Sequence, residues 1–159
     1  MTMPRFFPPL YCLRIQSDFA LWHLPFWYTL LRWFCFVLVA LALGYSTPSL
    51  GFFEIFILLF CLAAATFTEQ FRWYKNPLLL EKKWGFGFFQ FSKRWALDQS
   101  SKLICQKSGK KIILQMITLE GLLTLDKTAT EFESKRLIEL GQKTSSWLGL
   151  SLVVQETSH

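Results

Sequence analysis

Two apolar stretches separated by only four residues constrain this chain more than any other feature of its sequence. Residues 26–45 carry one charged side chain, Arg32, and residues 50–67 carry one, Glu54. A helix needs about 20 mostly apolar residues to cross the hydrocarbon core of a bilayer, which is about 30 Å thick. The short link between the stretches allows a turn and leaves no room for a domain. The pattern therefore predicts a membrane α-helical hairpin with two spans.

A buried helical pair in a soluble protein is the alternative interpretation of the same pattern. The chain is 52% hydrophobic and 18% aromatic, and a soluble domain of 159 residues would have difficulty burying so much apolar surface. We therefore favour the membrane hairpin.

Aromatic residues divide the chain into two parts. Of 28 aromatic residues, 26 lie at or before Trp95, and only Phe132 and Trp147 follow. This distribution predicts three segments, which are an interfacial N-terminal segment at 1–25, a two-helix transmembrane hairpin at 26–76 and a cytoplasmic domain at 77–159. About 80 residues suffice for one small core.

Positive charges predict how the hairpin is oriented. Lys and Arg accumulate on the cytoplasmic side of membrane spans, and here they flank both spans while the link has none. We therefore expect a multi-pass protein of the bacterial inner membrane with both termini in the cytoplasm. The N-terminus does not resemble a signal peptide, because 25 residues with four prolines precede the apolar run. The flanking charges are Arg5, Arg14 and Arg32 before the link, and Arg72, Lys75, Lys82 and Lys83 after it.

Amphipathic aromatic residues at the ends of the spans predict interfacial anchors. Trp and Tyr collect where a helix leaves the bilayer. Residues 10–22 fit a short interfacial helix, and residues 69–75 fit a helix end that stops at Asn76-Pro77. The expected anchors are Trp22, Trp27, Tyr28, Trp73 and Tyr74.

The remainder of the chain reads as strands followed by one helix. We expect strands at 78–82, 88–97, 103–107, 111–118 and 119–125, with turns at 84–87 and 108–109 and a bulge at Gly121. Thr130 and Glu133 fit a capping box that starts a helix ending at Gly149. The apolar stripe of this helix includes Trp147, which we expect in the core, and residues 150–154 return to strand character. The predicted fold is therefore α+β.

This layout resembles small bacterial two-span membrane proteins with a cytoplasmic pleckstrin-homology-like domain. The likeness rests on the two spans, the aromatic and basic segment 69–75, and the closing helix that ends in Leu148-Gly149-Leu150. The layout is also similar to that of the photosystem I assembly factor of cyanobacteria and plastids, although that family has a longer link between its spans. The resemblance implies an antiparallel PH-like sheet or barrel closed by one amphipathic helix, and a scaffolding or assembly role.

Basic residues concentrate in the first part of the predicted sheet. Residues 82–111 carry eight Lys and Arg against Asp98 alone, and they account for most of the net charge of +6. Near anionic headgroups each such residue contributes about 1 kcal/mol to binding. A lysine-rich sheet edge that resists aggregation is the alternative. The expected membrane contacts are Arg72, Lys75, Lys82, Lys83, Lys93 and Arg94.

No motif in the sequence predicts an enzyme, a metal site or a cofactor. Cys12, Cys35, Cys61 and Cys105 have no metal-ligand spacing, and the only histidines are His23 and His159. Nucleic acid is disfavoured as a partner by the membrane anchor. Two functions remain. The first is a non-catalytic scaffold, accessory or assembly factor that binds another integral membrane protein or complex. The second is a module that binds anionic lipid or a small ligand through its basic sheet.

Overall fold

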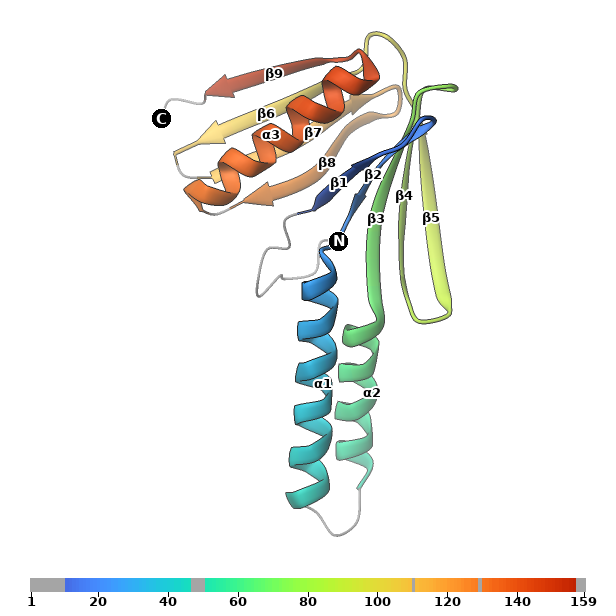
Figure 1. The fold of residues 1–159 in the computed structure, drawn as a ribbon, viewed down its shortest axis with the longest axis vertical. Helices are drawn as coiled ribbons and strands as arrows, with labels where there is room; N and C mark the ends of the chain where they lie inside the picture. The colour runs from blue at the N-terminus through green and yellow to red at the C-terminus, as the bar shows by residue number, and fades with distance from the viewer. Residues whose placement is uncertain (1–10, 47–50, 110, 129, 157–159) are drawn as a thin grey trace.

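The computed structural model describes residues 11–46, 51–109, 111–128 and 130–156, within which it has three α-helices and nine β-strands (Figure 1). Helices α1 (Phe26–Ser46) and α2 (Phe52–Thr66) lie side by side and project away from two β-sheets. Helix α3 (Glu131–Leu148) lies among the sheets. The molecule thus has an elongated shape, with an apolar helix pair at one end and a mixed α/β body at the other.

The first sheet is an antiparallel meander with the helix pair inserted in its middle. Its order is β1-β2-β3-β4-β5, and α1 and α2 connect β2 to β3, whose residues His23 and Gln70 are paired. The chain therefore enters and leaves the helix pair from neighbouring strands. The strands are β1 (Cys12–Ile15), β2 (Phe19–His23), β3 (Phe67–Tyr74), β4 (Leu79–Phe86) and β5 (Phe89–Ala96).

The second sheet combines an antiparallel meander with one parallel strand. Its order is β8-β7-β6-β9, and β9 runs parallel to β6 after the chain has crossed the sheet through α3. Thr130 caps α3 by accepting a hydrogen bond from the Glu133 N–H at 3.3 Å, and Gly149 ends it with a φ of 74°. The strands are β6 (Lys102–Ser108), β7 (Lys111–Thr118), β8 (Gly121–Thr128) and β9 (Ser151–Glu156).

One hydrophobic core joins α3 to both sheets. One side of α3 packs closely on the second sheet, because a Cβ at Gly141 would lie 3.4 Å from Leu114 Cδ1 of β7. Its other side meets the first sheet, where Trp22 Nε1 of β2 donates a hydrogen bond of 2.8 Å to Thr144 Oγ1. Both side chains of this bond are 0% exposed, so the bond satisfies a buried indole donor inside the core.

The expectation of a two-span hairpin is wrong. Among the described helices only α1 is long and apolar enough to cross a membrane, by length and composition. Helix α2 has 15 residues, which at 1.5 Å per residue give roughly 22 Å. It ends at Thr66 because residues 67–74 alternate between the two faces of a strand, with Phe71 and Trp73 buried and Arg72 and Tyr74 on the other face.

The expectation of a PH-like sheet or barrel closed by one helix is also wrong. The described strands form two open sheets rather than a closed barrel. Helix α3 packs on a face of the second sheet, and β9 then pairs with β6 in parallel. The first two strands come from residues that precede the helix pair, which the sequence analysis had not counted as strands.

Several local expectations also differ from the structure. The described residues of the expected interfacial helix at 10–22 do not form a helix, since β1 and β2 occupy 12–15 and 19–23. Residues 69–75 are not a helix end, since most of them belong to β3. Gly121 opens β8 with a φ of 124°, and the bulge lies instead further along β8 at Leu125, opposite Leu114 and Gln115 of β7. Trp147 is only half-buried at the edge of the core. The cap, the end of α3 and the approximate positions of β4 to β9 are confirmed.

The division into 1–25, 26–76 and 77–159 stays a prediction, but each of these ranges contributes a strand to the first sheet. Pro4, Pro8 and Pro9 of the N-terminal segment, with Arg5, and the link residues Thr47 to Ser49 lie outside the described residues.

Candidate functional site

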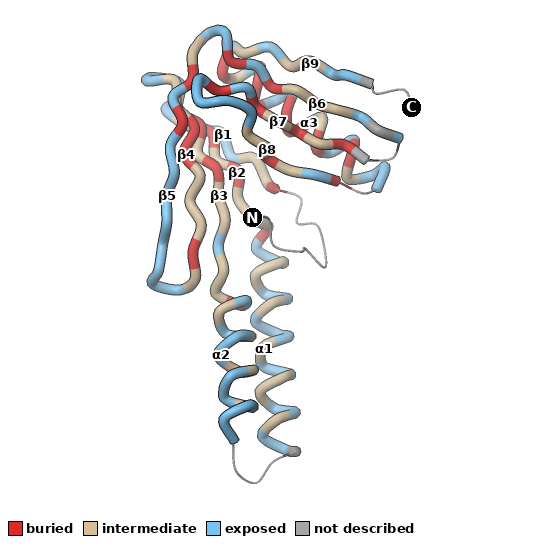
Figure 2. Tube along the Cα trace, turned by 180° about the vertical axis from the view of Figure 1, so that it is seen from behind, coloured by how far each residue is buried: buried red, intermediate tan, exposed pale blue. Residues whose placement is uncertain are grey.

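The helix pair exposes apolar side chains along most of its length. None of the 18-residue apolar segment of α1 is buried, which is unlike the core helix of a soluble protein (Figure 2). Helix α2 buries only Ala65. Monomeric soluble proteins rarely expose apolar patches of this extent. Large exposed side chains include Phe26, Trp27, Phe34 and Tyr45 of α1 and Phe52, Phe53, Phe56 and Phe60 of α2.

The β-strand register orders the residues of the first sheet by their distance from the helix pair. The row nearest to α2 contains Phe67, Phe86 and Phe89, and the Phe67 and Phe86 ring centroids are 5.1 Å apart. Two rows further on, Trp84 and Phe91 stack with centroids 6.2 Å apart. We call this set, together with the exposed turn residue Phe88, the aromatic belt. It lies where the sheet meets the helices.

Basic side chains follow the aromatic belt in the next rows of the same sheet, and we call these rows the basic rows. Lys83 is level with Gln70, and Lys82 and Lys93 are level with Phe71, four residues from the Phe67 row. At about 3.3 Å per residue, this row is roughly 13 Å from the end of α2. Lys82 Nζ is 2.7 Å from Glu69 Oε1 and lies over the Phe71 ring, whereas Lys93 is exposed and lies over Trp95.

The buried carboxylate of Glu81 pairs with basic side chains on the face of the first sheet that carries Arg72. Glu81 is 1% exposed and accepts hydrogen bonds from Arg94 Nε at 2.9 Å and from the Tyr74 hydroxyl at 3.3 Å, with Lys83 Nζ 3.5 Å away. Burial raises the pKa of Glu81, but the Arg94 hydrogen bond and the nearby positive charges outweigh it, so the pKa lies below its usual value. Arg94 and Lys83 thus stabilise the fold through Glu81 and also add positive charge to the surface.

The remaining predicted contact residues lie further from the helix pair. Arg72 is level with Glu81, and its guanidinium lies over the Phe19 ring at 6.0 Å. Lys75 follows the last residue of β3 at the far end of the sheet and lines a small depression there with Leu148 and Gly149. The segment 69–75 therefore runs away from the helices instead of surrounding their end.

The five predicted anchors separate into two groups. Trp22 and Trp73 are 0% exposed and belong to the core, so their prediction as interfacial anchors is wrong. The strand alternation of residues 19–23 and 67–74 is the sequence signal that places these rings inside. Tyr74 lies at the far end of β3, beside Phe19. Trp27 and Tyr28 lie in the first turn of α1, where their rings meet edge to face with centroids 5.9 Å apart.

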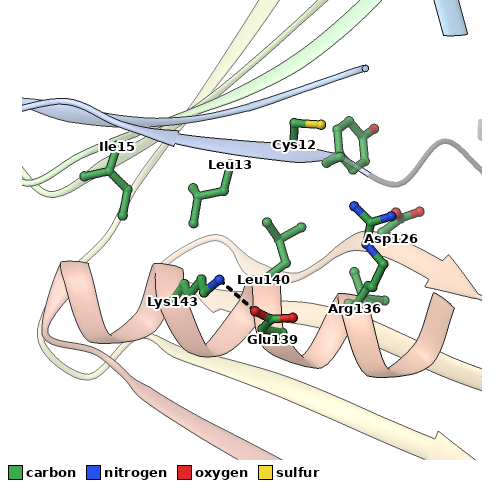
Figure 3. Close-up of a pocket in the computed structure, with 10 residues that line it drawn as sticks. Cys12, Leu13, Ile15, Asp126, Arg136, Glu139, Leu140 and Lys143 are labelled. Atoms are coloured by element: carbon green, nitrogen blue, oxygen red, sulfur yellow. Dashed lines mark ion pairs between the residues drawn. The ribbon is translucent and has the colours of Figure 1, made fainter. Parts of the chain in front are cut away.

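A separate groove of about 520 Å³ lies between β1 and α3 (Figure 3). Leu13 and Ile15 of β1 line one side, and Arg136 and Lys143 of α3 line the other. Lys143 Nζ is 2.7 Å from Glu139 Oε1, and this hydrogen bond lowers the pKa of Glu139. The β1 side of the groove is thus apolar, and the α3 side combines charged side chains with Leu137 and Leu140.

Metal-ligating residues do not cluster in the part of the chain that the structure describes, where no group of three or more His, Cys, Asp and Glu side chains occurs. Cys105 is buried in the core, and burial raises the pKa of its thiol. Cys35 is exposed on α1.

No family model matches the chain, and no curated protein is similar to it.

The strand and turn pattern predicted for residues 84–97 does not identify the aromatic belt. The signal that identifies it is the turn itself, because Gly87 sits among four phenylalanines and a turn residue points away from the sheet.

Proposed function

We propose that this protein is a non-catalytic accessory, scaffold or assembly factor of a membrane complex, held at the bilayer by α1. The exposed apolar surface of α1 carries the proposal, since a helix of this length and composition is stable in lipid and costly to hydrate. The sequence offers no recognised catalytic motif that would favour an enzyme.

A cleaved signal sequence fits the fold poorly. Cleavage after α1 would remove β1 and β2 together with the buried side chains Ala20 and Trp22, which pack against Phe71 and Trp73 of β3. We therefore propose that α1 is retained as an anchor.

We propose that α1 inserts into the membrane, with the shorter α2 packed beside it. Strands β2 and β3 pair directly, so the segments before and after the helices lie on the same side. Helix α1 is long enough to cross the hydrocarbon core, whereas α2 covers about three quarters of it. The basic rows of the first sheet favour the cytoplasmic face of a bacterial inner membrane for the two sheets.

The native thiol of Cys35 tests the insertion. In a variant with Cys12→Ser, Cys61→Ser and Cys105→Ala, a membrane-impermeant maleimide applied to open membrane fragments should leave Cys35 unlabelled until the membrane is dissolved in SDS. A Gln99→Cys substitution, in the exposed connection between β5 and β6, provides the matched accessible site and should be labelled at once. Labelling of Cys35 as fast as that of the Gln99 variant would refute insertion.

The basic rows support a second function, which is direct binding of anionic lipid by the sheet. Lys93 and Arg94 are exposed close to the aromatic belt, although Arg94 also pairs with Glu81. Purification from gently solubilised membranes separates the two functions. A stoichiometric membrane-protein partner would support the scaffold, and a monomer with bound anionic lipid would support the lipid module.

A further inference from the structure

The tip of the β4–β5 hairpin exposes large aromatic side chains beside the helix pair. The turn is formed by Gly87 and Phe88 between the paired residues Phe86 and Phe89. Phe88 is 102% exposed and Phe89 is 75% exposed, and Phe91 follows on the same strand at 54%. A phenyl ring held fully in water at a turn calls for a contact that the isolated chain does not provide.

The backbone holds this tip in a fixed place relative to α2. The Gly87 N–H donates a hydrogen bond of 3.4 Å to the Thr66 carbonyl oxygen, the last residue of α2. The tip reaches the level at which α2 ends in both views of the molecule (Figures 1 and 2). Any surface that receives the helices therefore also meets the tip.

Two glycines allow the tight turn and the close approach of β4 and β5 at the tip. Gly87 has a φ of 53°, which suits the first position of a two-residue hairpin turn. At Gly85 a Cβ would collide with the Phe89 carbonyl oxygen, so β4 and β5 approach each other closely only because no side chain is present there.

We infer that the β4–β5 hairpin is a second membrane-contact element, whose tip inserts Phe88 and Phe89 into the interfacial layer of the bilayer that receives α1. The inference rests on the proposed function. Lipid is favoured over a protein partner for two reasons. The tip is continuous with the exposed apolar surface of the helices. The basic rows lie further from the helices than the tip, on the side where lipid headgroups would be. Aromatic rings are enriched at this depth in membrane proteins.

Site-specific fluorescence in reconstituted membranes tests the inference. The parent carries Cys12→Ala, Cys35→Ala and Cys61→Ala and retains Cys105, which is buried and should take no label. Single cysteines are then introduced by Phe88→Cys at the tip, Val37→Cys on the exposed face of α1 and Gln99→Cys at the far end of the first sheet. Each full-length variant is labelled with an environment-sensitive dye and reconstituted in vesicles of phosphatidylcholine and phosphatidylglycerol.

Quenchers at known depths give the readout. The Phe88 site should show blue-shifted emission, quenching by a spin label near the headgroups and protection from aqueous iodide. The Val37 site should be quenched by a spin label deep in the acyl chains, and the Gln99 site by iodide alone. Because Phe88 is fully exposed, its variant should unfold at the same temperature as the parent.

The two proposals fail in distinguishable ways. Iodide quenching at Phe88 equal to that at Gln99, with Val37 still quenched from the acyl chains, would overturn the insertion of the tip and leave the anchor intact. Iodide quenching at Val37 would overturn the proposed anchor and the inference with it.

Discussion

Glu81 combines near-complete burial with a charge that three neighbours stabilise. Its folded-state pKa lies below the value of about 4.3 expected for an unfolded chain, so the ionised group stabilises the fold above that pH. This contribution disappears as the pH falls through the lower folded-state pKa, because the carboxylate then protonates. The stability of the protein should therefore decrease on acidification below about pH 4.3.

Glu81→Gln should lower the free energy of unfolding by about 1–2 kcal/mol at pH 7, because it removes a charge-assisted acceptor from Arg94. Solvent screening limits the effect, since the Arg94 side chain is 68% exposed. The difference between wild type and variant should shrink on acidification, as measured by thermal unfolding in detergent. Glu131→Gln is the control, because Glu131 pairs with Lys135 at 3.7 Å on the surface and should have almost no effect. A loss of stability that is as large at acidic pH as at pH 7 would contradict the stabilising role of ionised Glu81.

Single residues with a strong local signal could be predicted from the sequence. Thr130 and Gly149 were identified as the cap and the end of α3 because helix termini depend on neighbours within four residues. Trp22 and Trp73 were misplaced because an aromatic ring next to charged residues fits both a membrane interface and the buried face of a strand. The alternation of residues 19–23 and 67–74 favours the strand, and the pairing of β2 with β3 across the inserted helices establishes it.

At the scale of elements, α1 and α2 show what composition does and does not determine. Apolar composition identified both helices, but the end of α2 depends on where β3 begins to pair with β4. Residues 67–74 alternate between faces with a period of two, and this signal was outweighed by the aromatic and basic residues that resemble a helix end. The length of an apolar helix such as α2 therefore depends on the pairing of the strand that follows it as well as on hydropathy.

Leu38→Arg on α1 tests the environment of that helix. Leu38 is 49% exposed, so in water an arginine would be tolerated, whereas near the centre of a bilayer it costs about 2.5–3.5 kcal/mol. We expect the variant to shift from the carbonate-resistant membrane pellet to the supernatant, or to be degraded. Phe132→Arg is the matched control, since Phe132 is 69% exposed on α3 and lies outside the helix pair. Equal retention of both variants in the pellet would argue against a lipid-embedded α1.

At the scale of the whole molecule, the parallel strand β9 and the two-sheet arrangement could not be read from the sequence. Short apolar segments such as 150–154 predict a strand but not its partner or its direction. Strands β1 and β2 were hidden inside a segment interpreted as interfacial, so the number of strands fitted one sheet. The groove between β1 and α3 was equally invisible, because its two sides are more than 100 residues apart in the sequence.

The shared core predicts that residues 77–159 do not fold when excised. Trp22, Phe71 and Trp73 are fully buried and would all be lost, and truncating one such residue costs about 3–5 kcal/mol. Three such losses together, about 9–15 kcal/mol, are comparable with the whole stability of a typical domain, about 5–15 kcal/mol. We expect the fragment to lack near-ultraviolet circular dichroism and a cooperative thermal transition. The matched variant keeps residues 11–23 and 67–156 and replaces 24–66 by a short Gly/Ser linker, which suits the antiparallel pairing of His23 with Gln70. That variant should be soluble and unfold cooperatively, since it retains every strand and loses only the apolar helices. A cooperative transition in the 77–159 fragment would show that the second part of the chain is an independent domain and that β1 to β3 are dispensable for its core.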